Sequence, residues 1–85
     1  MVRWYRDVAE LGDPSAQLTL GGMYSEGLAV ERDDVRAVYW WRRSAQQGYP
    51  SAQFHLGQMY WRGRGAEQDT ALAVHWWRNV ARQSG

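Results

Sequence analysis

The sequence has 85 residues, enough for one small domain, so its six Trp and five Tyr are expected to provide much of the buried surface. Ten Arg, no Lys and nine acidic residues give a net charge of +1, which argues against a charge-driven partner such as nucleic acid. The absence of Cys excludes disulfides, a thiolate nucleophile and a Cys-based zinc site.

The N-terminal segment is charged. Residues 1–12 contain Arg3, Arg6, Asp7 and Glu10, so this segment lacks the unbroken apolar core of a signal peptide. No stretch of the chain is long and apolar enough to span a bilayer. These features predict a soluble, cytoplasmic protein, with a piece of a longer secreted protein as the alternative.

The chain contains an internal repeat of 36 residues. Residues 13–48 (the first unit) and 49–84 (the second unit) are identical at half of their aligned positions, far more than unrelated sequences would share. Three positions recur three times, as Trp4/Trp40/Trp76, Arg6/Arg42/Arg78 and Ala9/Ala45/Ala81. Residues 1–12 are therefore predicted to be the second half of a unit, and residues 1–85 to be one domain of two and a half repeats.

Five helices are predicted, in chain order at residues 1–11, 14–26, 34–47, 50–62 and 70–83. In the first helix of each unit, Ala16, Leu20 and Tyr24 and their counterparts share one face. In the second helix Ala37, Trp40 and their counterparts do the same. The spacing predicts an all-α fold, an α-solenoid of antiparallel helix pairs.

The helix boundaries carry residues suited to caps. The N-cap candidates are Asp13, Asp33 or Asp34, and Asp69, and the left-handed C-terminal candidates are Gly12, Gly27, Gly48 and Gly63.

Two segments, residues 16–24 and 52–60, resemble the Sel-one-like repeat family, which is related to the tetratricopeptide repeat. The Ala-x-x-Trp-Trp-Arg runs that begin at Ala37 and Ala73 share this resemblance. It implies a non-enzymatic adaptor for multiprotein assembly that binds a protein or peptide. One departure is visible, because the family's Gly-x-Gly after the first helix is present at residues 63–65 but reads Gly-Leu-Ala at residues 27–29. The loop of the first unit is therefore expected to take a different turn.

The sequence contains no clear set of catalytic residues. His55 and His75 lie on different helices without metal-ligand spacing, so neither a metal site nor a cofactor is predicted. The pair Asp33 and Asp34 is better explained by helix capping than by paired carboxylates. Four arginines raise the question of a local basic patch, although a solvated face is the favoured interpretation: Arg42, Arg43, Arg62 and Arg64.

By the resemblance, the face of each first helix that the core does not need lines a concave groove. In the first unit this face carries Ser15, Leu18, Thr19, Gly22, Ser25 and Glu26, and in the second unit Ser51, Phe54, His55, Gln58, Trp61 and Arg62. The residues differ while the anchors repeat, as expected if the groove serves a ligand. The alternative is that Phe54 and Trp61 cover the seam between repeats. Relatives that clamp a C-terminal carboxylate use Lys and Asn, and this groove has no Lys.

The last predicted helix carries an apolar strip. Leu72, Trp76 and Val80 are spaced at i, i+4 and i+8, and two of them replace the Arg36 and Ser44 of the first unit. The first helix also looks open at Val2, Trp4, Tyr5 and Val8. Contiguous apolar surface favours an interface, so a homodimer or small oligomer through Leu72, Trp76 and Val80 is predicted, with continuation into a longer chain as the alternative.

Overall fold

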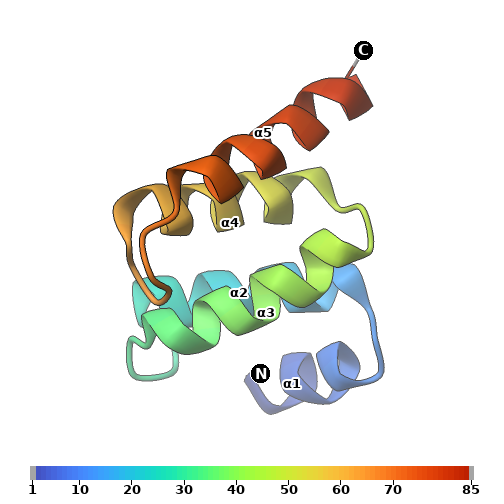
Figure 1. The fold of residues 1–85 in the computed structure, drawn as a ribbon. Helices are drawn as coiled ribbons and strands as arrows, with labels where there is room; N and C mark the ends of the chain where they lie inside the picture. The colour runs from blue at the N-terminus through green and yellow to red at the C-terminus, as the bar shows by residue number, and fades with distance from the viewer. Residues whose placement is uncertain (1, 85) are drawn as a thin grey trace.

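A computed structural model describes residues 2–84, which form five α-helices joined by short loops. Consecutive helices run antiparallel and pack on one another, and the two termini lie at opposite ends of the stack (Figure 1). The helices are α1 (Val2–Glu10), α2 (Pro14–Glu26), α3 (Asp34–Gln46), α4 (Pro50–Arg62) and α5 (Thr70–Ser84). The predicted all-α fold is confirmed, and the observed helix ends agree with the predicted ones to within one residue. Residue 1, the start of the first predicted helix, lies outside the described residues.

Aspartate side chains begin three of the helices. Asp13, Asp33 and Asp69 each accept a hydrogen bond from a backbone N–H two or three residues further on, at 2.9–3.1 Å. Of the two candidates before α3, Asp33 is therefore the cap. Tyr49, which is equivalent to Asp13, makes no such bond. There the helix begins with Pro50, whose nitrogen needs no partner.

The loops between the two helices of each unit have the same backbone shape. Gly27 and Gly63 end the first helices in the left-handed region, with φ of 70° and 67°. Two residues later Ala29 and Gly65 are also left-handed, with φ of 63° and 70°. The expectation of a different turn at Ala29 is wrong, because the same backbone hydrogen bonds close both loops and fix their course. Alanine adopts this conformation at a cost of about 1–2 kcal/mol.

In the second unit this loop lies against the preceding unit. A Cβ on Gly65 would collide with the backbone carbonyl of Asp34 and approach Val38, so the loop can lie on α3 only because position 65 is glycine. The side chain of Ala29 is exposed.

Exchanging the residue at this loop position should change stability in opposite directions in the two units. Ala29→Gly removes the left-handed alanine and should raise the free energy of unfolding by about 0.5–1 kcal/mol. Gly65→Ala, the matched variant, adds a strained φ and a methyl group against α3 and should lower it by more than about 2 kcal/mol. Urea denaturation measures both changes. A loss of stability in Ala29→Gly would contradict the assigned loop conformation.

Within each unit a tryptophan of the second helix lies directly on a glycine of the first. A Cβ at Gly21 would lie 2.5 Å from Trp41 Cδ1, and one at Gly57 would lie 2.5 Å from Trp77 Nε1. Each indole N–H donates to the backbone carbonyl three residues before that glycine, at 3.1 and 3.3 Å. The helix pair is therefore held by close packing and by a satisfied polar group.

Buried glutamines form one kind of hydrogen bond between neighbouring units. Buried Gln17 donates its Nε2 to the backbone carbonyl of Ala9 at 2.9 Å, and Gln53 donates to that of Ala45 at 3.1 Å. Each of these carbonyls lies in the last turn of its helix and also accepts a backbone N–H, from Gly12 or Gly48, at 3.0 Å, so the glutamine supplies a second donor.

Arginines of the second helices form another kind of hydrogen bond between units, with tyrosine hydroxyls of the following helix. Arg6 donates to Tyr24 at 3.1 Å and Arg42 donates to Tyr60 at 2.7 Å. Burial alone would raise the pKa of Tyr24, but hydrogen bonds and positive charge from Arg36 and Arg6 lower it overall.

The buried core confirms the predicted anchor positions. Leu20 and Leu56 are fully buried, and the repeated Ala, Met and Tyr positions of α2 and α4 join the same cluster. Within residues 2–84, no helix combines the length and apolar character that crossing a membrane requires.

Candidate groove between α2 and α4

The two first helices of the units enclose a groove of about 340 Å³, which we call the α2–α4 groove. One wall is α2, the other is α4, and α3 lies beneath them. The lining residues are Leu18, Gly22, Ser25, Glu26, Trp41, Ser51, His55, Gln58, Met59, Arg62 and Arg64.

The groove contains most of the residues predicted to form it. Eight predicted positions line it, namely Leu18, Gly22, Ser25, Glu26, Ser51, His55, Gln58 and Arg62. Four predicted positions do not: Ser15, Thr19, Phe54 and Trp61. The division follows the helix geometry, because residues three and four apart lie on one stripe and only one stripe of each helix faces the other helix.

Phe54 and Trp61 lie beside the groove stripe of α4 without lining the groove, at positions equivalent to Leu18 and Ser25. They are 45% and 48% exposed. The ring centroid of Phe54 is 5.9 Å from that of His55. The ring centroid of Trp61 lies 5.6 Å from that of Trp77 in the same unit. Trp61 therefore covers part of the α4–α5 contact and still presents half of its surface to solvent.

Trp41 forms the floor of the groove and was assigned only to the core by the sequence. It is 4% exposed, and its ring stacks on His55 with centroids 4.8 Å apart and an interplanar angle of 16°. Its repetition as Trp77 marked it as a structural anchor, and the same repetition gave no sign that one face also meets the groove. One sign of this role is present in the sequence, because position 55 carries an aromatic ring, His55, where the equivalent position of the first unit carries Thr19.

The imidazole of His55 is the one histidine group in the groove. Burial lowers the pKa of His55 below its ordinary value, and the negative charge of Glu26 offsets part of this effect. The neutral ring is therefore favoured in the folded protein, where it stacks on Trp41.

This lowered pKa predicts a loss of stability in acid. The unfolded chain takes up a proton at His55 near its ordinary pKa of about 6.5, before the folded chain does. The free energy of unfolding should therefore fall as the pH drops from about 6.5 toward the folded-state value. His55→Gln should flatten this slope, measured by urea denaturation at several pH values. The matched variant His75→Gln, at an exposed position, should keep the slope of the parent chain. A slope that is unchanged in His55→Gln would contradict the assignment of this pH dependence to His55.

The charged side chains of the groove differ in whether they are paired. Arg64 reaches Asp34 of α3 with two hydrogen bonds, at 3.2 and 3.3 Å, and this links the two units. Arg62 makes no hydrogen bond or ion pair with any residue between 2 and 84. The interpretation of these arginines as a merely solvated face is thus wrong for Arg64 and Arg42, since each bonds across the junction between units.

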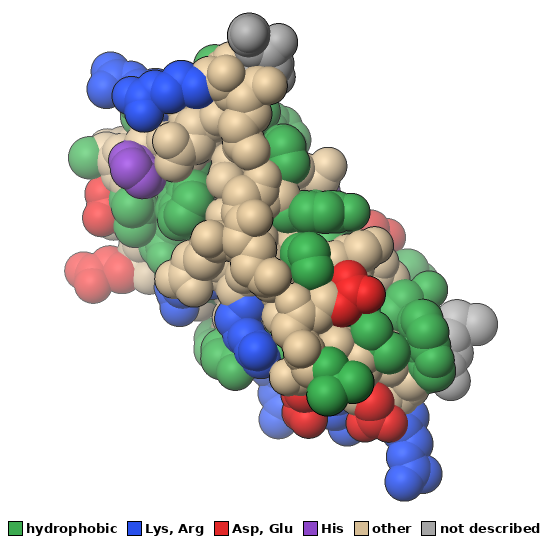
Figure 2. Space-filling view, turned by 90° about the vertical axis from the view of Figure 1, so that its right-hand side faces the viewer, with side chains coloured by type: hydrophobic (Ala, Val, Ile, Leu, Met, Phe, Trp, Pro, Cys, Tyr) green, Lys and Arg blue, Asp and Glu red, His purple; other side chains and the backbone are tan. Residues whose placement is uncertain are grey.

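No single sign of charge dominates the visible surface. In Figure 2 basic and acidic side chains are interspersed among hydrophobic groups. This distribution matches the net charge of +1 and offers no extended field for a polyanion.

The predicted self-association strip is partly buried. Leu72 and Trp76 pack against the core, and Val80 is also half-buried. On α3, Asp34, Val38, Arg42 and Ala45 meet α4 or the loop that follows it. The equivalent residues of α5 form a strip beside the predicted one. This open strip consists of Thr70, Val74, Arg78 and Ala81.

The repeated helix pair matches a known family. The model of the Sel1 repeat matches residues 14–49 and again residues 50–84. The chain belongs to the Sel1 repeat family. Sel1 repeats are generally protein–protein interaction modules.

Solved structures show the same arrangement of Sel1 repeats. A protective antigen of uropathogenic Escherichia coli that displays an SLR fold is 39% identical with a TM-score of 0.95, covering 99% of this chain and 18% of that one. A Sel1 repeat protein from Oxalobacter formigenes is 32% identical with a TM-score of 0.93, covering 95% and 33%. The cysteine rich protein B of Helicobacter pylori, at 19% identity, shows the fold alone, with a TM-score of 0.92 over 99% and 63%.

The chain thus spans less than two thirds of the length of each of these three proteins. No curated protein sequence matches it.

Proposed function

We propose that this Sel1 repeat chain is a scaffold or adaptor that binds a protein or peptide segment in the α2–α4 groove. The observation that supports this most directly is the contrast between fixed and variable positions. Leu20, Tyr24 and their counterparts are buried and identical in the two units. The groove residues His55, Gln58 and Arg62 of the second unit stand where the first unit has Thr19, Gly22 and Glu26.

The groove offers polar groups that the fold leaves unpaired. Gln58, Arg62 and Ser51 form no side-chain hydrogen bond with any residue between 2 and 84. Polar side chains of this kind recognise the backbone amides of an extended segment, and Arg62 suits an acidic side chain. Leu18 and Met59 supply apolar surface beside them. The matching partner is an extended segment with an acidic residue beside an apolar one.

The proposal predicts that groove variants lose binding without losing stability. Peptides selected from a displayed random library against the intact chain provide the probe, and calorimetry gives their dissociation constants. Arg62→Ala and Gln58→Ala should each raise the dissociation constant by about tenfold, which corresponds to about 1.4 kcal/mol. Their melting temperatures should stay close to that of the parent chain, because Arg62 is exposed and Gln58 only partly buried.

The matched control is Arg3→Ala, which removes an equal charge from the exposed face of α1. It should leave peptide affinity unchanged. Trp61→Ala separates the two interpretations of that residue: weaker binding with an unchanged melting temperature favours a groove role, and a lower melting temperature with unchanged binding favours the seam role. Selected peptides that bind the Arg62 and Gln58 variants as tightly as the parent chain would refute the groove proposal.

Self-association through α5 is the second candidate. It is supported by the open strip beside Leu72, Trp76 and Val80, because the equivalent strip of α3 is covered by α4. Exposed Arg78 has no tyrosine partner within the described residues, whereas Arg6 and Arg42 each have one. A second copy of the chain would bury this surface.

Light scattering tests this candidate on the whole chain. The expected result is a concentration-dependent dimer or small oligomer. Leu72→Arg combined with Val80→Ser should dissociate it if the predicted strip is the interface, and Val74→Arg should do so if the neighbouring strip is. A monomer at millimolar concentration, or an oligomer that survives both sets of changes, would rule out association through α5.

A further inference from the structure

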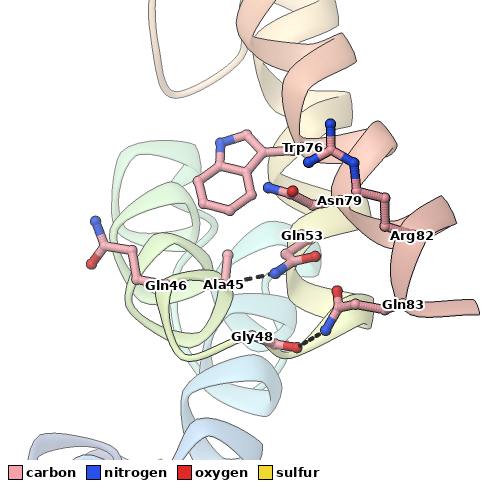
Figure 3. Close-up of a pocket in the computed structure, with 8 residues that line it drawn as sticks. All are labelled: Ala45, Gln46, Gly48, Gln53, Trp76, Asn79, Arg82 and Gln83. Carbon is pink, nitrogen blue, oxygen red and sulfur yellow. Dashed lines mark hydrogen bonds between the residues drawn. The ribbon is translucent and has the colours of Figure 1, made fainter.

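A second cavity lies apart from the α2–α4 groove and shares no lining residue with it. Its volume is about 420 Å³, and it lies between the end of α3, the start of α4 and the second half of α5 (Figure 3). We call it the α5 pocket. Its polar and aromatic lining consists of Gln46, Gln53, Trp76, Asn79, Arg82 and Gln83.

The α5 pocket contains a buried hydrogen-bond acceptor without a donor. Gln53 is 4% exposed, and its Nε2 is used by the bond to Ala45. Its Oε1 has no partner among the described residues. Figure 3 shows this amide among the pocket residues, with its oxygen turned toward the α5 side. Nearly all buried side-chain oxygens in folded proteins are paired, so this one points to a missing donor.

The first unit shows what the donor should be. There Gln17 is buried in the same way, and its Oε1 accepts a hydrogen bond of 2.8 Å from the amide of Gln47. The residue equivalent to Gln47 is Gln83, which donates instead to the backbone carbonyl of Gly48 at 2.6 Å. The second unit therefore has the equivalent acceptor, Gln53 Oε1, but its Gln83 amide donates to a different group.

The two units also differ in what lies against the tryptophan of the pocket wall. In the first unit the guanidinium of Arg43 lies over the ring of Trp40, 5.2 Å from its centroid. The equivalent pair in the second unit is Asn79 and Trp76, and the shorter Asn79 side chain meets His75 at 3.5 Å. Within the described residues, a guanidinium thus lies over the indole in the first unit and none lies over Trp76 in the second.

We propose that the α5 pocket binds a primary carboxamide group. Its N–H donates to Gln53 Oε1, its plane stacks on the indole of Trp76, and its carbonyl accepts from the guanidinium of Arg82. A carboxylate lacks the N–H that the inner acceptor requires. A cation is disfavoured because Arg82 is the only charged side chain in the lining. A neutral amide satisfies both ends of the site.

Two sources could supply this group. One is a free small amide such as glutamine, and the other is an Asn or Gln side chain of a bound peptide. Both use the same chemistry in the pocket, so they are distinguished by experiment.

The first experiment compares propionamide with propionate on the intact ¹⁵N-labelled chain by NMR. Propionamide should shift the indole N–H of Trp76 and the side-chain amide of Gln53 in a saturable way, with a dissociation constant on the order of millimolar. The indole N–H of Trp40 is the internal control and should not move. Propionate should bind at least about tenfold more weakly, because a site that hydrogen-bonds an N–H rejects the analogue without one.

Variants test the geometry without disturbing Gln53, whose replacement could unfold the chain. Asn79→Arg recreates in the second unit the guanidinium that Arg43 places over Trp40, and it should abolish the propionamide response. Arg82→Ala should weaken the response several-fold. Arg3→Ala removes the same charge from an exposed position on α1, outside the pocket, and should have no effect.

A final comparison identifies the source. Tighter binding of free L-glutamine than of the blocked tripeptide Ala-Gln-Ala indicates a small amide ligand, and the reverse order indicates a partner's side chain. Either order supports the carboxamide site. The proposal is overturned if no carboxamide binds, if propionate binds as well as propionamide, or if the response persists in Asn79→Arg.

Discussion

The indole of Trp41 lies on the backbone of Gly21, and no side chain separates α2 from α3 at that point. A methyl group there would lie 2.5 Å from the ring, so any other residue would push the two helices apart or turn the indole out. The ring is also fixed in rotation, because its N–H donates to the carbonyl of Leu18. One contact thereby sets both the spacing of the helix pair and the direction of its largest side chain.

The groove depends on this contact. Once Trp41 is fixed on α2, His55 of α4 stacks on it, so the position of the second unit relative to the first is tied to the packing of the first. The junction bonds from Gln53 and Arg42 act at other points of the same seam. Several hydrogen bonds and one stacked pair therefore hold the walls of the groove, and its residues Ser51, Gln58 and Arg62 make no side-chain hydrogen bond within residues 2–84.

The two units share one backbone conformation and differ in the chemistry of equivalent side chains. The loops at Ala29 and Gly65 have the same conformation, although only glycine avoids strain there. Gln17 and Gln53 bond to equivalent carbonyls, yet only Gln17 has its oxygen paired. A solenoid tolerates such differences because each unit contacts only its neighbours, and a change at one site does not disturb the others. Sites with distinct chemistry can thus arise at equivalent positions.

The sequence by itself determined the helices, their order and the core, because the 36-residue period, the capping aspartates and the buried Ala, Leu and Tyr positions are local signals. It also placed most of the groove, since unrepeated positions such as His55 and Arg62 lie on one helix face. Only the tertiary structure decided that Trp41 forms the groove floor, that Phe54 and Trp61 do not line the groove, and that the Oε1 of Gln53 lacks a donor among the described residues. These features depend on which stripe of one helix meets the next helix, and on side-chain orientations that a periodic pattern does not specify.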